Sequence, residues 1–150
     1  MAGPPITIAR ILELLPHRPP MLFIDRVLEV TPDETVAEKL VSIGEPVLAG
    51  HFPGEPIVPG VLLIEAMAQT AALGVLVNSP EQRGRGMALL GINRARFRRP
   101  VVPGDRVRIH VKLVRRHGDV YRFAGTAQVE GDLVAEAELM AAFLDRKEED

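Results

Sequence analysis

The chain has 150 residues, a length that suits a single domain over residues 1–150, and a formal net charge of −2. It contains no cysteine, which excludes a disulfide framework and a thiolate metal site and is compatible with the cytoplasm. A sequence pI of 6.1 and few aromatic residues disfavour nucleic-acid binding, and residues 1–10 show no secretory signal, so we expect a cytoplasmic protein.

The first predicted elements are a short helix and two strands. Apolar residues recur at helical spacing over residues 6–15, which predicts a helix. Residues 21–30 and 35–43 are apolar and partly β-branched, so each segment predicts a strand, with a turn between them. The following segment, residues 44–60, is rich in proline and glycine and is predicted to be irregular.

A long apolar segment follows at residues 61–77. Thirteen of its 17 residues are Ala, Val, Ile, Leu or Met, and Glu65 is its only charged residue. A segment that is apolar on nearly all sides predicts a buried helix. It is shorter than the roughly 20 residues that span a bilayer, and it carries a carboxylate, so we expect no membrane insertion.

The chain after Met87 is predicted to return to strands. Apolar and polar residues alternate strictly over 106–113, as in a half-buried strand. Residues 121–129 and 133–144 predict two more strands joined by hairpin turns, although the second is rich in alanine and also fits a helix. Two strands, one buried helix and about three strands predict an α+β fold in which a sheet wraps around the helix.

Glu65 is the first candidate functional residue, because an isolated ionised carboxylate is costly to bury. It needs a partner, a cavity or a proton. Gln69 lies four residues later on the same helical face and can reach it. The alternative is a structural glutamate at the helix mouth that pairs with an arginine.

His51 is the second candidate, in the Gly/Pro segment before the helix. A neutral imidazole can act as a base near physiological pH, although a lone loop histidine is also compatible with a solvated side chain. Gly60 stands at the predicted start of the helix, where free N–H groups and the positive end of the helix dipole can hold an oxyanion.

The segment around these residues resembles a known family. The run Gly50-His51-Phe52-Pro53-Gly54, then Pro59-Gly60-Val61 and Glu65-Ala66-Met67-Ala68-Gln69, is similar to the signature of the β-hydroxyacyl-[acyl carrier protein] dehydratases of type II fatty-acid synthesis. Two further blocks agree, Leu15-Pro16-His17-Arg18 with Asp25-Arg26, and Gly91-Ile92-Asn93 with Arg99-Pro100-Val101.

The resemblance implies a hot-dog fold, in which a curled antiparallel sheet wraps a long central helix. It further implies a homodimer, assembled into a homohexamer as a trimer of dimers, with each active site at a dimer interface. His51 of one subunit would be the base and Glu65 of the other, kept protonated by its apolar setting, the acid. Substrate-binding positions would be Gly60, Val61, Gln69 and Phe52. The implied partner is acyl carrier protein bearing a hydroxyacyl-phosphopantetheine, and no metal or other cofactor is implied.

The positive charge is concentrated in one part of the chain. Eleven of the eighteen Lys and Arg residues lie between Arg83 and Arg116, where Asp105 is the only acid. Such a block can steer an acidic carrier protein, or it can be a solvated strand face. The candidate docking residues are Arg94, Arg96, Arg98 and Arg99.

Two further residues and one segment are assigned more modest roles. His17 is expected to be a structural hydrogen bonder. Met21 stands where the family often has Phe, which we interpret as a mild change in the core. Residues 85–90, where relatives often carry an aromatic residue that gates the tunnel, have none. Competing interpretations are a thioesterase or coenzyme A-linked hydratase of the same fold, and a non-catalytic acyl-binding module.

Overall fold

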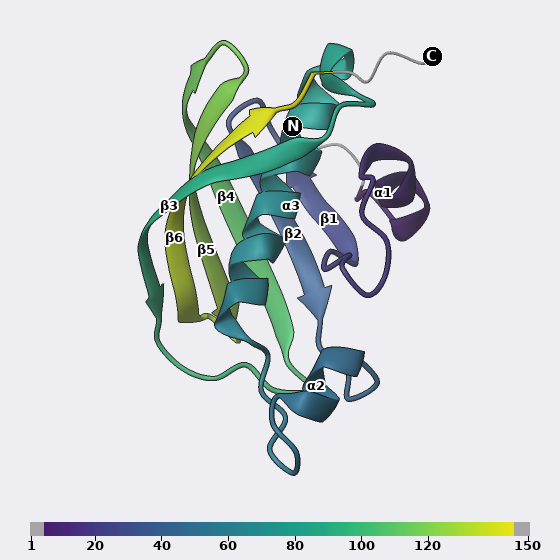
Figure 1. The fold of residues 1–150 in the computed structure, drawn as a ribbon, viewed down its shortest axis with the longest axis vertical. Helices are drawn as coiled ribbons and strands as arrows, with labels where there is room; N and C mark the ends of the chain where they lie inside the picture. The colour runs from purple at the N-terminus through teal and green to yellow at the C-terminus, as the bar shows by residue number, and fades with distance from the viewer. Residues whose placement is uncertain (1–4, 146–150) are drawn as a thin grey trace.

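The computed structural model describes residues 5–145 as one curled sheet packed around a long helix (Figure 1). The elements are α1 (Ile8–Leu14), β1 (Arg26–Val30), β2 (Glu34–Leu40), α2 (Pro46–Gly50), α3 (Gly60–Asn78), the 3-10 helix η1 (Pro80–Gln82), β3 (Met87–Phe97), β4 (Arg106–His117), β5 (Val120–Val129) and β6 (Asp132–Phe143).

The six strands form one antiparallel sheet in the order β1-β2-β4-β5-β6-β3. The sheet curls around α3, while α1 lies beside the helix near the β1 edge (Figure 1). This arrangement confirms the α+β, hot-dog architecture expected from the sequence. It leaves β3 and β1 as the two edge strands.

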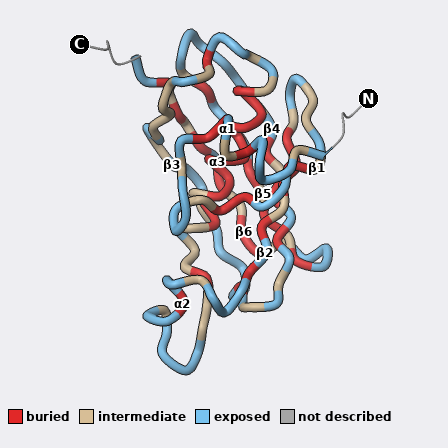
Figure 2. The backbone as a smooth tube through the Cα atoms, turned by 90° about the vertical axis from the view of Figure 1, so that its right-hand side faces the viewer, coloured by how far each residue is buried: buried red, intermediate tan, exposed pale blue. Residues whose placement is uncertain are grey.

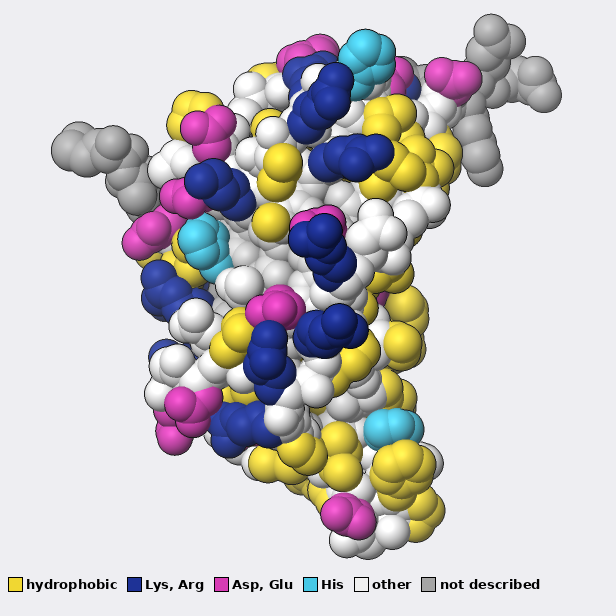
Figure 3. All heavy atoms as spheres, turned by 90° about the vertical axis from the view of Figure 1, so that its left-hand side faces the viewer, with side chains coloured by type: hydrophobic (Ala, Val, Ile, Leu, Met, Phe, Trp, Pro, Cys, Tyr) yellow, Lys and Arg dark blue, Asp and Glu magenta, His cyan; other side chains and the backbone are white. Residues whose placement is uncertain are grey.

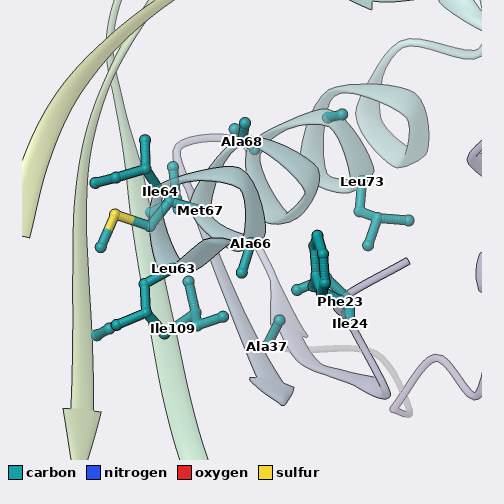
Figure 4. Packing of buried hydrophobic residues seen from close by; sticks show 14 of the residues in the cluster. Phe23, Ile24, Ala37, Leu63, Ile64, Ala66, Met67, Ala68, Leu73 and Ile109 are labelled. Atoms are coloured by element: carbon teal, nitrogen blue, oxygen red, sulfur yellow. The ribbon is translucent and has the colours of Figure 1, made fainter. Parts of the chain in front are cut away.

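Helix α3 is the core of the fold, as its composition predicts. From Ala66 to Leu76 every residue is buried, and the helix runs through the most buried part of the molecule (Figure 2). Its 19 residues are long and apolar enough to cross a membrane, with a mean hydropathy of 1.8 over 18 of them, but 72% of that stretch is buried inside the protein, as in a core helix. Leu63, Ile64 and Met67 point toward the strands (Figure 4).

The structure corrects the sequence-based boundaries in the N-terminal half. The predicted strand over residues 21–30 begins only at Arg26, because the backbone of Met21 and Phe23 is bound by the side chain of Gln69 instead of by a strand. The segment 44–60, predicted to be wholly irregular, contains the short helix α2, which has Pro46 in its first turn, where proline is tolerated.

The C-terminal half contains four strands rather than about three. The alanine-rich segment forms strand β6 because β5 and β3 pair with it on both sides. The hairpin at Gly118–Asp119 is confirmed. The next turn lies one residue earlier than predicted, at Glu130 and Gly131, whose φ angles of 51° and 83° fit a type I′ turn.

Candidate active site

His51 is held in a defined orientation in the loop between α2 and α3. Its Nδ1 lies 2.7 Å from the carbonyl oxygen of Ile57, and its ring stacks on Phe52 with centroids 4.0 Å apart. A carbonyl oxygen can only accept a hydrogen bond, so in neutral His51 the proton resides on Nδ1 and Nε2 keeps a free lone pair. The side chain is half-buried, which excludes the interpretation of a freely solvated loop histidine.

His51 shares an open hollow of about 480 Å³ with the N-terminal end of α3. Gly60 and Val61 line this hollow, together with Phe97 at the end of β3. The N-cap of α3 is Pro59, and no side chain caps the helix, so the N–H groups of its first turn are not bonded by a capping residue. The hollow therefore combines an imidazole with the positive end of a helix dipole.

The ring of Phe97 packs closely against the backbone of Gly60. A Cβ atom added at Gly60 would lie 2.7 Å from Cε1 of Phe97, closer than van der Waals contact allows. The absence of a side chain thus brings the end of β3 onto the start of α3.

Glu65 is bound by two polar side chains at a single oxygen. Its Oε1 lies 3.1 Å from Nε2 of Gln69 and 3.4 Å from Nε2 of His17. The prediction that Gln69 reaches Glu65 is confirmed, and within residues 5–145 no arginine is hydrogen-bonded or ion-paired to Glu65. The contact with His17 was not anticipated, because the two residues are far apart in sequence and only the folded chain brings them together.

The pKa of Glu65 is lowered, contrary to the expectation of a carboxyl group kept protonated by an apolar setting. Burial has the largest influence and raises the pKa, but the hydrogen bonds from His17 and Gln69, aided by the charge that His17 can carry, together outweigh it. Because 24% of the Glu65 side chain is exposed, its desolvation is incomplete. A single chain therefore favours the ionised carboxylate.

One chain does not bring His51 and Glu65 into one cavity. Glu65 is not among the residues that line the hollow of His51, and within residues 5–145 no hydrogen bond or ion pair joins the two side chains. Among the same residues, no three His, Asp or Glu side chains gather in a way that could hold a metal ion.

The predicted basic block is interleaved with acidic side chains. Arg98 lies 3.0 Å from Glu136, and Arg94 lies 3.8 Å from Glu138, so two of the candidate docking residues face acids of β6. Arg99 donates to the carbonyl oxygen of Val129 at 3.3 Å. Figure 3 shows blue and magenta side chains alternating over this face of the molecule. The face is thus of mixed charge, contrary to the uniform block in the sequence.

The structure also places Met21 and the segment 85–90. Met21 is 50% exposed and lies at an apolar cavity, so its replacement of the common Phe is not a change in the core. In the segment 85–90, Arg85 makes a bidentate contact with Asp119 and bonds to the carbonyl oxygen of Leu144, which ties this segment to the sheet.

Comparison with known proteins places the chain among curated relatives. Residues 15–138 match the family model of the FabA-like domain. The 3-hydroxyacyl-[acyl-carrier-protein] dehydratase FabZ of Anaeromyxobacter sp. (strain K) is 48% identical over 147 residues, covering 96% of this chain and 94% of the relative. The FabZ of Roseiflexus sp. (strain RS-1) is 49% identical over 138 residues, covering 91% and 96%.

Solved structures agree with the architecture. The dehydratase heterocomplex ApeI:P from Xenorhabdus doucetiae matches with a TM-score of 0.80 and 22% identity, covering 90% of this chain and 91% of that one. At that level of identity the match supports the fold alone. The identity to curated relatives over nearly the whole chain is decisive, and the protein belongs to the FabZ family of 3-hydroxyacyl-[acyl-carrier-protein] dehydratases.

Proposed function

We propose that the protein dehydrates (3R)-hydroxyacyl-[acyl carrier protein] to trans-2-enoyl-[acyl carrier protein] in fatty-acid elongation. The names of the relatives support this activity and its carrier-protein substrate. The observation that carries the chemistry is the orientation of His51, whose Nδ1 is bound by the Ile57 carbonyl. Nε2 is then a neutral base in a hollow that also holds the N-terminus of α3.

The elimination assigns a role to each residue. Nε2 of His51 removes a proton from C2 of the thioester, and electron density moves toward the thioester oxygen. The N–H of Gly60 stabilises that developing charge. Glu65 protonates the C3 hydroxyl, which leaves as water as the C2–C3 double bond forms. The proton taken by His51 is finally returned to Glu65, so the residues are regenerated without a redox change.

We place the acid of each site on a second copy of the chain. Among the described strands, the edge strand β3 pairs with β6 alone, and it exposes apolar side chains. Those on β3 that are exposed are Leu89, Leu90, Ile92 and Phe97. Because Phe97 also lines the hollow of His51, a second copy joined at this edge would cover the hollow and present its own Glu65 to it. A trimer of such dimers is our proposal for the full assembly.

Closure of the site also accounts for the acid role of Glu65. The single chain lowers the pKa of Glu65, since donors surround one oxygen while part of the side chain stays in water. A second copy and an acyl chain would displace that water and raise the pKa, because desolvation penalises the charged form. Gln69 keeps the carboxyl group oriented during this change. Val61 and Phe52 provide apolar contacts to the substrate.

The activity is tested with crotonyl thioesters of acyl carrier protein and of coenzyme A. A dehydratase run in reverse adds water, so the enoyl absorbance falls while no free thiol appears. Thiol release would instead identify a thioesterase, and preference for the coenzyme A substrate would identify a coenzyme A-linked hydratase. No change with either substrate would identify a non-catalytic module.

The shared site is tested by mixing two inactive variants in one cell. In a dimer of His51→Ala with Glu65→Gln chains, one of the two sites regains both residues, so a random mixture should recover about one quarter of the wild-type rate. No recovery, from chains shown to form mixed dimers, would place both residues in the same subunit's site.

A further inference from the structure

Gln69 is fixed so firmly that it determines how Glu65 is oriented. Its Oε1 accepts from the backbone N–H of Phe23 at 2.8 Å, and its Nε2 donates to the carbonyl oxygen of Met21 at 2.7 Å. The side chain is 1% exposed. These two bonds settle which end of the amide is the donor, and the same Nε2 donates to Oε1 of Glu65 at 3.1 Å.

His17 reaches the same oxygen from the segment that follows α1. Its Nε2 lies 3.4 Å from Oε1 of Glu65, a long contact of the kind that tightens when a site closes. Its Nδ1 is buried, and within the described chain it has no hydrogen-bond partner. A protonated His17 would need an acceptor at Nδ1, so the neutral ring with its proton on Nε2 is the form that fits this environment.

The two donors leave the other carboxyl oxygen free. In the part of the chain that the structure describes, no group is hydrogen-bonded or ion-paired to Oε2 of Glu65. A proton on a carboxyl group resides on the oxygen that is not already accepting from donors. The transferable proton of Glu65 therefore belongs on Oε2.

We propose that His17 is a positioning residue for Glu65. Its neutral ring donates the Nε2–H to Oε1 of Glu65, which leaves Oε2 of Glu65 to carry the proton given to the substrate. The inference rests on the proposed function for the identity of the reaction, whereas the contacts of His17 and Gln69 with Glu65 are independent of it. His17 thereby differs from an electrostatic partner, since its charge is not needed for the contact.

Arg18, the residue next to His17, is bound to backbone carbonyl oxygens. It donates to those of Leu12, Leu15 and His17. The groups that face Glu65 are thus His17 from the N-terminal segment and Gln69 from its own helix, to which the proposed dimer would add His51 of the second copy. Within residues 5–145 His17 has no ion pair other than its contact with Glu65, so the effects of its substitution can be attributed to the loss of that contact.

The test compares His17→Leu, which removes the donor, with His17→Gln, whose Nε2–H can occupy the place of the imidazole Nε2–H. The titration of Glu65 is followed by carbon NMR in protein labelled at glutamate side chains, and its signal is identified by its loss in Glu65→Gln. We expect the pKa of Glu65 to rise in His17→Leu and to stay near the wild-type value in His17→Gln, because only the second variant stabilises the ionised form.

Turnover of the assembled enzyme supplies the second readout. We expect His17→Leu to lower kcat about tenfold or more with little change in KM, and His17→Gln to recover most of the rate. His110→Leu is the matched control, because His110 Nε2 lies 3.4 Å from Glu34 Oε1 on the outer face of the sheet. That variant should change neither kcat nor the titration of Glu65.

An unchanged Glu65 titration in folded His17→Leu would overturn the inference, whatever the rate does. Equal loss of kcat in His17→Leu and His17→Gln, with the titration of Glu65 shifted alike in both, would also overturn it, since a donor would then not be what matters. If the titration shifts as expected but the wild-type protein does not hydrate crotonyl thioesters, the proposed function fails and the role of His17 toward Glu65 stands.

Discussion

The two ends of α3 differ in how completely the protein closes them. At the C-terminal end, the side chain of Arg83 donates to the carbonyl oxygen of Leu76 and the N–H of Ser79 donates to that of Val75, which satisfies two of the carbonyl groups that a helix end otherwise leaves unpaired. At the N-terminal end no side chain caps the helix, and Val61 is 70% exposed. The same helix is thus sealed where it supports the sheet and open where the candidate chemistry lies.

Because of this difference, we expect residues near the C-terminal end of α3 to determine stability and residues near its N-terminal end to determine activity. Residues near the open end carry polar groups and exposed apolar surface. Substituting them should therefore lower the catalytic rate more than the free energy of unfolding. The residues from Ala71 to Leu76, toward the sealed end, are buried, so truncating them should lower stability while the remaining folded molecules keep their activity. Variants at either end test the separation.

The largest effect is expected at the open end, on rate. His51→Ala and Glu65→Gln should each lower the rate of crotonyl thioester hydration by at least about a hundredfold, because each removes a proton-transfer group. The midpoint of thermal unfolding should change little. A near-wild-type rate in either variant would remove that residue from the mechanism.

The largest effect on stability is expected at the sealed end. Leu73 is 0% exposed, and Leu73→Ala should reduce the free energy of unfolding by about 2–5 kcal/mol through lost burial and a new cavity. Urea denaturation measures the loss, and kcat per folded molecule should stay close to that of the wild type. A hundredfold fall in kcat at this position would show that the two ends are coupled.

A smaller, pH-dependent effect is expected beside the sealed end. The Arg85 hydrogen bond is the main cause of the lowered pKa of Asp119, so the ionised Asp119 stabilises the fold above its unfolded pKa. Asp119→Asn should lower the Tm at neutral pH, and the gap to the wild type should close as the pH falls below 3.8, the ordinary value for Asp. A gap that persists in acid would attribute the effect to shape and not to charge.

The smallest effect is expected at Val61. Val61→Ser should change the free energy of unfolding by less than about 0.5 kcal/mol, because the side chain is already in water. The loss of its apolar contact should raise KM for a medium-chain acyl substrate about fivefold. An unchanged KM would exclude Val61 from the substrate-binding surface.

The sequence predicts helix α3 itself better than the contacts made at its open end. The apolar run at residues 61–77 identifies the helix to within one residue at each end, because a segment that is apolar on nearly all sides favours a buried helix. Strict alternation likewise identifies β4. The contact of His17 with Glu65 leaves no mark on periodicity, because it joins segments that meet only after the sheet has closed around the helix.

The charges show a second limit of sequence reading. The basic residues of β3 form a block along the chain, yet β6 pairs with β3 and places Glu136 and Glu138 among them. The alanine-rich β6 could be read as helix or strand, and only its two neighbours decide between them. Strand pairing thus determines features that no single segment encodes.

Because Gly60 and Phe97 approach so closely, any side chain at position 60 would occupy space now filled by the ring at position 97. A larger side chain at position 60 would have to push the ring outward, and a smaller ring at position 97 would open a gap above the helix start. Substitutions that survive at one position should therefore be accompanied by compensating ones at the other, so the two positions should coevolve as a pair.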